Sequence, residues 1–138
     1  MAKTRSMRSK RNKTVSNRSN TKQITVYFME MLMMVKLFHW KTHSFATHKA
    51  TDELYDSLNG HIDTFIEVLL GKTGSRINLL GKKSISLVDL NSQASLKARI
   101  EQFKRFLERL PDQGTDLMNI RDEILGDLNK FLYLLTFK

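Results

Sequence analysis

The chain has 138 residues with no cysteine and one proline, and 41% of its residues are hydrophobic. This length suits a single domain with a sizeable core, and the lack of cysteine excludes disulfides, thiol nucleophiles and cysteine-ligated metal sites. No apolar run reaches the length of a membrane span, and the first residues lack the apolar stretch of a secretory signal. We therefore expect an intracellular protein, in the cytoplasm, at the nucleoid or in a virion, with no membrane partner.

The net charge of +9 is concentrated at the start of the chain. Residues 1–22 hold eight bases and no acid, whereas the bases and acids of the other residues nearly balance. Because residues 1–22 hold few apolar side chains, we predict a disordered tail that binds DNA non-specifically by neutralising phosphates. The alternative is a solvated extension that aids solubility or carries an import signal. The DNA-binding candidates are Lys3, Arg5, Arg8, Lys10, Arg11, Lys13, Arg18 and Lys22.

The rest of the chain, residues 23–138, has the apolar spacing of helices and no strand-like alternation. Thr47 or Thr51 is expected to cap the second helix and Gly71 to end it. Within the longest break, residues 85–90 could form one or two helical turns. The lengths of the three links predict an all-α four-helix bundle with one long crossover. The predicted helices cover residues 22–43, 47–70, 94–110 and 115–136.

Polar residues follow the second predicted helix at steps of three and four. This stripe starts with a histidine close to two others and includes four carboxylates, which repel one another unless a cation lies opposite. Imidazole and carboxylate together suit iron, manganese or zinc. The alternative is a solvated outer face; His61 lies off the stripe and is expected to be exposed and uninvolved. The stripe comprises His48, Asp52, Asp56, Asn59, Asp63 and Glu67, and the nearby histidines are His39 and His43.

The run FHWKTHSFATHKATDELYDSLNGHIDTFIEVL resembles the core of Dps, the DNA-protecting, ferritin-like family. The matching positions are a His-Trp pair, a second histidine, two aspartates and a glutamate: His39, Trp40, His48, Asp52, Asp63 and Glu67. The resemblance covers about residues 22–110, and the sequence also resembles proteins of large DNA viruses. The interval from His39 to His48 is shorter than in the family, so His43 is an alternative to His48.

The resemblance implies a ferritin-like fold and a di-iron site between two subunits of a homo-oligomer, a dodecameric shell. His39 would be a ligand from one subunit, supported by His48, with Asp52 as an accessory ligand. Asp63 and Glu67 would come from the other subunit, with Glu67 bridging two irons. Such a site oxidises Fe(II) with hydrogen peroxide or oxygen and so implies a ferroxidase that sequesters iron and binds DNA.

Two other functions remain open at this point. One is a non-enzymatic protein of the same fold that packages DNA or builds a virion or nucleoid, with a lost or vestigial metal site. The other is a dimeric helical adaptor with an exposed acidic face, which would leave the spacing of the stripe as a coincidence.

Overall fold

The computed structural model describes the backbone of residues 2–138 and the side chains of residues 20–138. The chain forms four helices: α1 (Ala2–Lys41), α2 (Phe45–Thr73), α3 (Gln93–Glu108) and α4 (Thr115–Leu134). No strand occurs in residues 2–138, so the predicted all-α four-helix architecture is confirmed. Helix α1 includes residues 2–22, for which the sequence predicted a disordered tail, so the disorder of the tail is not confirmed. The side chains of residues 1–19 lie outside the described part, and the DNA contacts of the tail stay predictions.

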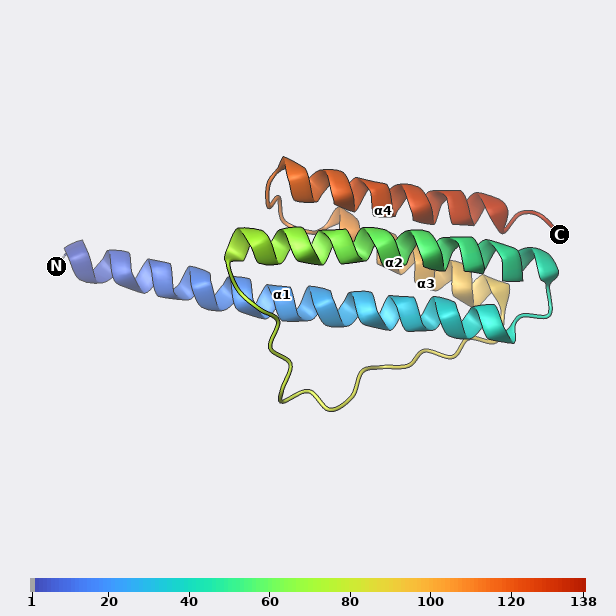
Figure 1. Cartoon of the computed structure of the whole chain (residues 1–138), viewed down its shortest axis with the longest axis horizontal. Coiled ribbons are helices and arrows are strands. Elements are labelled where there is room, and N and C mark those ends of the chain that lie inside the picture. The colour runs from blue at the N-terminus through green and yellow to red at the C-terminus, as the bar shows by residue number, and fades with distance from the viewer. Residues whose placement is uncertain (1) are drawn as a thin grey trace.

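The four helices lie side by side in a bundle (Figure 1). A short turn at residues 42–44 joins α1 to an antiparallel α2, which packs against both α1 and α4. Helix α3 packs against α4. The link between α2 and α3, residues 74–92, runs outside α1 to the opposite end of the bundle, so that α2 and α3 point the same way (Figure 1).

The long link is held to α1 at two places. The Ser86 amide donates to Glu30 Oε1 at 3.0 Å, and Lys41 Nζ donates to Asp89 Oδ1 at 2.7 Å. The predicted helical turns at residues 85–90 are wrong, because this stretch is extended and places alternate residues on the bundle. Val88 and Leu90 accordingly pack against the core while Leu87 faces out.

The core is built from apolar side chains that recur every three or four positions on each helix. Phe28 of α1 meets Phe65 of α2 and Phe103 of α3 edge to face, with ring centroids 5.5 and 5.9 Å apart. Phe131 of α4 is also fully buried. Burying each of these rings stabilises the fold by roughly 1.5–3 kcal/mol. The aromatic cluster therefore joins α1, α2 and α3, and Phe131 adds a buried ring from α4.

The ends of α2 differ from the prediction. Ser44, not Thr47 or Thr51, caps its start and accepts a hydrogen bond from the Thr47 amide at 3.2 Å, whereas both threonines are buried inside the helix. The helix continues past Gly71 to Gly74, whose φ of 65° ends it and whose amide bonds the Leu70 carbonyl. Gly71 is accommodated within the helix, so the left-handed backbone of Gly74 decides the boundary.

No helix in the described residues combines the length and the hydropathy that crossing a membrane requires.

Candidate metal site

His39 and His48 form a reciprocal pair at the junction of α1 and α2. His39 Nδ1 lies 2.9 Å from the His48 carbonyl oxygen, and His48 Nδ1 lies 2.9 Å from the His39 carbonyl oxygen. The two rings stack with centroids 3.9 Å apart and an interplanar angle of 18°. His39 is buried whereas His48 is exposed. The pair therefore ties the last turn of α1 to the first turn of α2.

These hydrogen bonds fix which nitrogens of the two rings are free. A carbonyl oxygen only accepts, so each Nδ1 carries a hydrogen and each Nε2 is left for another partner. His39 Nε2 lies 3.9 Å from Asp52 Oδ1, and more than half of the Asp52 side chain is exposed. Metal-binding histidines have the same arrangement, with one ring nitrogen donating to the protein while the other binds the ion.

Asp63 and Glu67 do not join this cluster within one chain. Both lie on the exposed face of α2, and neither side chain has a hydrogen bond or ion pair to another described residue. They follow Asp52 by 11 and 15 residues, which along a helix is roughly 16 and roughly 22 Å. Within one chain, His39 therefore lies beside His48 and Asp52, whereas Asp63 and Glu67 lie too far along α2 to join them.

His43 does not replace His48. Helix α1 ends at Lys41, so His43 lies in the turn rather than one helical turn beyond His39. Its side chain is exposed. The structure stacks His48 on His39 despite the short interval between them, because Ser44 starts α2 directly after the turn.

The expectation that His61 is exposed and uninvolved is wrong. Its side chain is one-third exposed, and His61 Nδ1 bonds Asp127 Oδ2 of α4 at 2.5 Å. His61 Nε2 lies 3.5 Å from Glu123 Oε2, also on α4. The spacing of Glu123 and Asp127 places both on one face of a helix, but the sequence does not show that this face meets His61.

Three or more histidine, aspartate or glutamate side chains do not converge on a single point anywhere in the described residues. A complete metal site within one chain is therefore not present in that part of the molecule. This agrees with the separation of Asp63 and Glu67 from the histidine pair. A single chain does not test whether a site forms between two chains.

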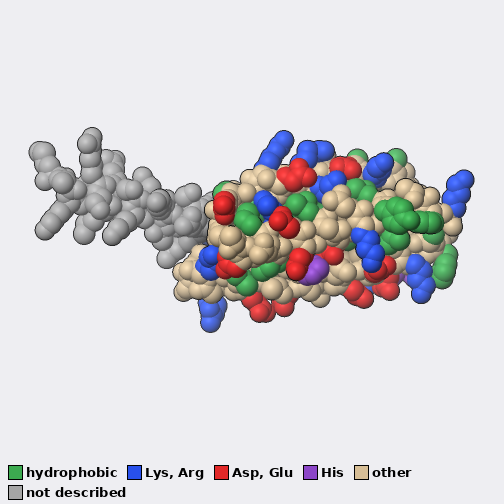
Figure 2. Space-filling model, turned by 90° about the horizontal axis from the view of Figure 1, so that it is seen from above, with side chains coloured by type: hydrophobic (Ala, Val, Ile, Leu, Met, Phe, Trp, Pro, Cys, Tyr) green, Lys and Arg blue, Asp and Glu red, His purple; other side chains and the backbone are tan. Residues whose placement is uncertain are grey.

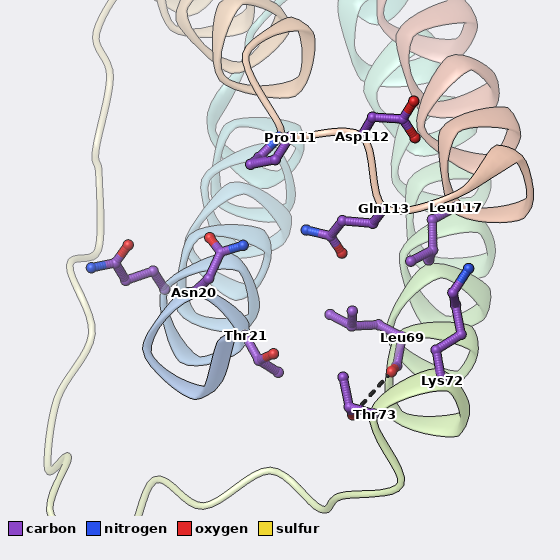
Figure 3. A pocket seen from close by; sticks show the side chains of 10 residues that line it. Asn20, Thr21, Leu69, Lys72, Thr73, Pro111, Asp112, Gln113 and Leu117 are labelled. Atoms are coloured by element: carbon purple, nitrogen blue, oxygen red, sulfur yellow. Dashed lines mark hydrogen bonds between the residues drawn. The ribbon is translucent and has the colours of Figure 1, made fainter. Parts of the chain in front are cut away.

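A cavity of about 720 Å³ lies at the other end of the bundle, between residues 20–23 of α1, the end of α2 and the α3–α4 link (Figure 3). The Gln113 side chain points into it, and Gln113 Oε1 is buried without a hydrogen-bond partner among the described atoms. Lys72 is the one basic residue among the described lining residues, and it is paired with Asp116. The lining residues contain no histidine, so this cavity lacks the chemistry of the junction.

Among residues 20–138, three ionisable groups have shifted pKa values, and all three lie away from the histidine pair. A hydrogen bond from Lys72 lowers the pKa of the Asp116 carboxyl, and a hydrogen bond to Glu53 raises the pKa of the Lys130 ammonium. Burial raises the pKa of the Tyr27 hydroxyl. The first two pairs join α2 to α4 at its two ends.

Comparison with known proteins gives a family but no function. No curated protein and no solved structure matches the chain. One family model matches residues 39–135, which include the histidine pair, the acidic stripe and helices α2 to α4. The chain belongs to this family, a family of unknown function designated DUF5856.

Proposed function

We propose that the protein is a Dps-like ferroxidase, which oxidises Fe(II) at a site shared by two copies of the chain and binds DNA non-specifically through its basic N-terminal residues. The observation that carries the proposal is the reciprocal histidine pair. It leaves Nε2 of His39 and of His48 free, with the Asp52 carboxylate near His39 Nε2. Imidazole and carboxylate donors with open positions suit ferrous iron.

The second copy would complete the site with Asp63 and Glu67. When two copies pair the same surface about a two-fold axis, one end of that surface on the first copy contacts the opposite end on the second copy. If the exposed faces of α1 and α2 pair in this way, the histidines of one copy meet the acids of the other. The exposed side chains of Met29, Met33 and Trp40 lie on α1 and support this pairing, since it would remove them from water.

The reaction follows from the donors of the proposed site. Two ferrous ions, the substrate, each lose one electron, and one hydrogen peroxide takes up both electrons and two protons to form two waters. The carboxylates of Asp52, Asp63 and Glu67 offset the added charge of ferric iron, and the two imidazoles hold the ions in place. Because Fe(II) and hydrogen peroxide together generate hydroxyl radicals, consuming both near bound DNA would protect the DNA from damage.

The first test is Fe(II) oxidation, followed by absorbance, with peroxide or oxygen. Wild type should oxidise Fe(II) well above the buffer rate, and Glu67→Ala should reduce oxidation to that rate, because the bridging carboxylate is lost. Glu108→Ala is the matched control, since Glu108 is also an exposed helical glutamate without an ion pair among the described residues. Equal oxidation by wild type and Glu67→Ala would refute the assignment.

The second test concerns DNA. Removing residues 1–22 should abolish binding to a duplex while oxidation continues, because the eight bases lie in that segment. Wild-type binding should weaken steeply as salt rises, by about 0.9 in log K per decade for each phosphate neutralised. Salt-independent binding would contradict the tail model. DNA binding without any oxidation would leave the packaging function in place of the ferroxidase.

A further inference from the structure

A second cluster of metal-ligating side chains lies between α2 and α4, away from the histidine junction. His61 is held between two carboxylates of α4: Asp127 Oδ2 lies 2.5 Å from Nδ1, and Glu123 Oε2 lies 3.5 Å from Nε2. Asp127 is the least exposed of the three side chains, at 16%, whereas Glu123 is 61% exposed. Figure 2 looks onto the α4 side of the molecule and shows histidine surface beside acidic side chains.

We propose that His61 and Glu123 bind a divalent transition-metal ion of the zinc class, with Asp127 as the positioning residue of His61. This site is independent of the proposed ferroxidase, since it uses none of the same residues. It lies within one chain and is open to solvent, so water completes the coordination.

The positions of the three side chains fit these roles. Asp127 accepts the hydrogen of Nδ1 and thereby directs the lone pair of Nε2 to the other side of the ring, as carboxylates behind metal-binding histidines do. An ion bound to both Nε2 and Glu123 Oε2 at ordinary zinc distances of about 2.1 Å would form an angle of about 113° between them at their 3.5 Å separation. That angle is close to tetrahedral.

The local charge favours a cation as well. The cluster holds two carboxylates, and the neighbouring bases of α4 are engaged elsewhere. Lys130 bonds Glu53, and Arg121 bonds Asp122. A divalent ion would balance both carboxylates while leaving the imidazole neutral, whereas a proton on His61 balances only one of them.

Calorimetric titration of the full chain with Zn²⁺ tests the site. His61→Gln should lose one binding event relative to wild type, and His43→Gln should bind as wild type does, because His43 is exposed and outside the cluster. Asp127→Asn should weaken that event by roughly tenfold or more, the usual effect of removing the residue behind a metal-binding histidine. Circular dichroism checks that each variant is folded.

The outcomes separate this inference from the proposed function. Unchanged Zn²⁺ binding in folded His61→Gln would overturn the site, and unchanged binding in Asp127→Asn would overturn the positioning role. If His61→Gln does not fold, Glu123→Gln replaces it, because Glu123 is mostly exposed and should lose the same event. Glu67→Ala should retain this Zn²⁺ site. It should do so whether or not the wild-type protein oxidises iron.

Discussion

At the scale of single residues, His39 and His48 show how backbone hydrogen bonds can prepare a side chain for binding. Each ring gives its Nδ1 hydrogen to the carbonyl of the other residue, and their stacking holds both rings in place. Thr51 Oγ1 also lies 3.1 Å from His39 Nδ1. The fold thus holds both rings in fixed positions, which would lower the cost of binding an ion at their Nε2 atoms.

Gly114 is the residue whose replacement should be most informative about the fold. Its φ of 111° is rarely adopted by other residues, and a Cβ at this position would collide with Lys72 Nζ and lie 2.8 Å from Asp116 Oδ1. Gly114→Ala should therefore reduce the free energy of unfolding by about 1–3 kcal/mol. Urea denaturation followed by circular dichroism measures the change.

Gly126→Ala is the matched control. Gly126 lies within α4, and a Cβ there meets nothing within 4 Å. Alanine should stabilise the helix by about 0.5–1 kcal/mol, because glycine loses more backbone entropy on folding. Destabilisation by both substitutions, or by neither, would contradict the role assigned to the backbone of Gly114.

At the scale of the elements, two ion pairs hold α4 to α2. Lys72 near the end of α2 bonds Asp116 in the first turn of α4 at 2.7 Å, and Glu53 near the start of α2 bonds Lys130. Asp116 also lies at the N-terminus of α4, where a negative charge is favourable. Because both pairs are exposed, each adds only modestly to the stability of the fold. They favour one register between α2 and α4.

The Asp116 pair predicts a pH dependence of stability. The hydrogen bond from Lys72 lowers the pKa of Asp116 in the folded state below its unfolded value. Its contribution is therefore fully present above the unfolded pKa and is lost as the pH falls through the folded pKa. Asp116→Asn should melt below wild type at pH 7, and the difference should close on acidification. A difference in Tm that is constant with pH would contradict this.

At the scale of the whole molecule, the exposed face of α1 and α2 is the surface on which the proposed function depends. Lys36 Nζ lies over the rings of Trp40 and Tyr55, so the aromatic end of α1 adjoins α2. Trp40 itself is 71% exposed in the single chain. In the proposed dimer this ring would be removed from water, which is favourable for an aromatic side chain.

Trp40→Glu should block assembly without unfolding the chain. Because Trp40 is exposed, its replacement removes little core packing, but the carboxylate would have to lose its water in the proposed dimer, a cost that an ion pair with Lys36 offsets only in part. Light scattering after size exclusion should show a monomer, and iron oxidation should fall with it. Leu80→Glu is the control, because Leu80 is 91% exposed in the long link. If Trp40→Glu has the same oligomeric mass as this control, the proposed interface is refuted.

Much of the fold could be predicted from the sequence because helical periodicity is a local property. The spacing of residues such as Phe28, Phe65 and Phe103 predicted the helices and their buried faces, with ends within a few residues for α2, α3 and α4. The start of α1 was missed, since this helix begins at Ala2 and not at residue 22. The ends of α2 were missed, since Ser44, Thr47 and Thr51 are equally good caps by residue type. The extended path of residues 85–90 was missed because an apolar run suits a helix or an extended chain equally well.

The sequence by itself determined the four helices, the long link, the basic residues at the start and the acidic stripe along α2. Only the tertiary structure decided that His48 rather than His43 stacks on His39, that one chain leaves Asp63 and Glu67 apart from them, and that His61 meets Asp127 and Glu123. The physical reason is that periodicity fixes which face of a helix a residue occupies, whereas the rotation and register of two packed helices decide which faces meet.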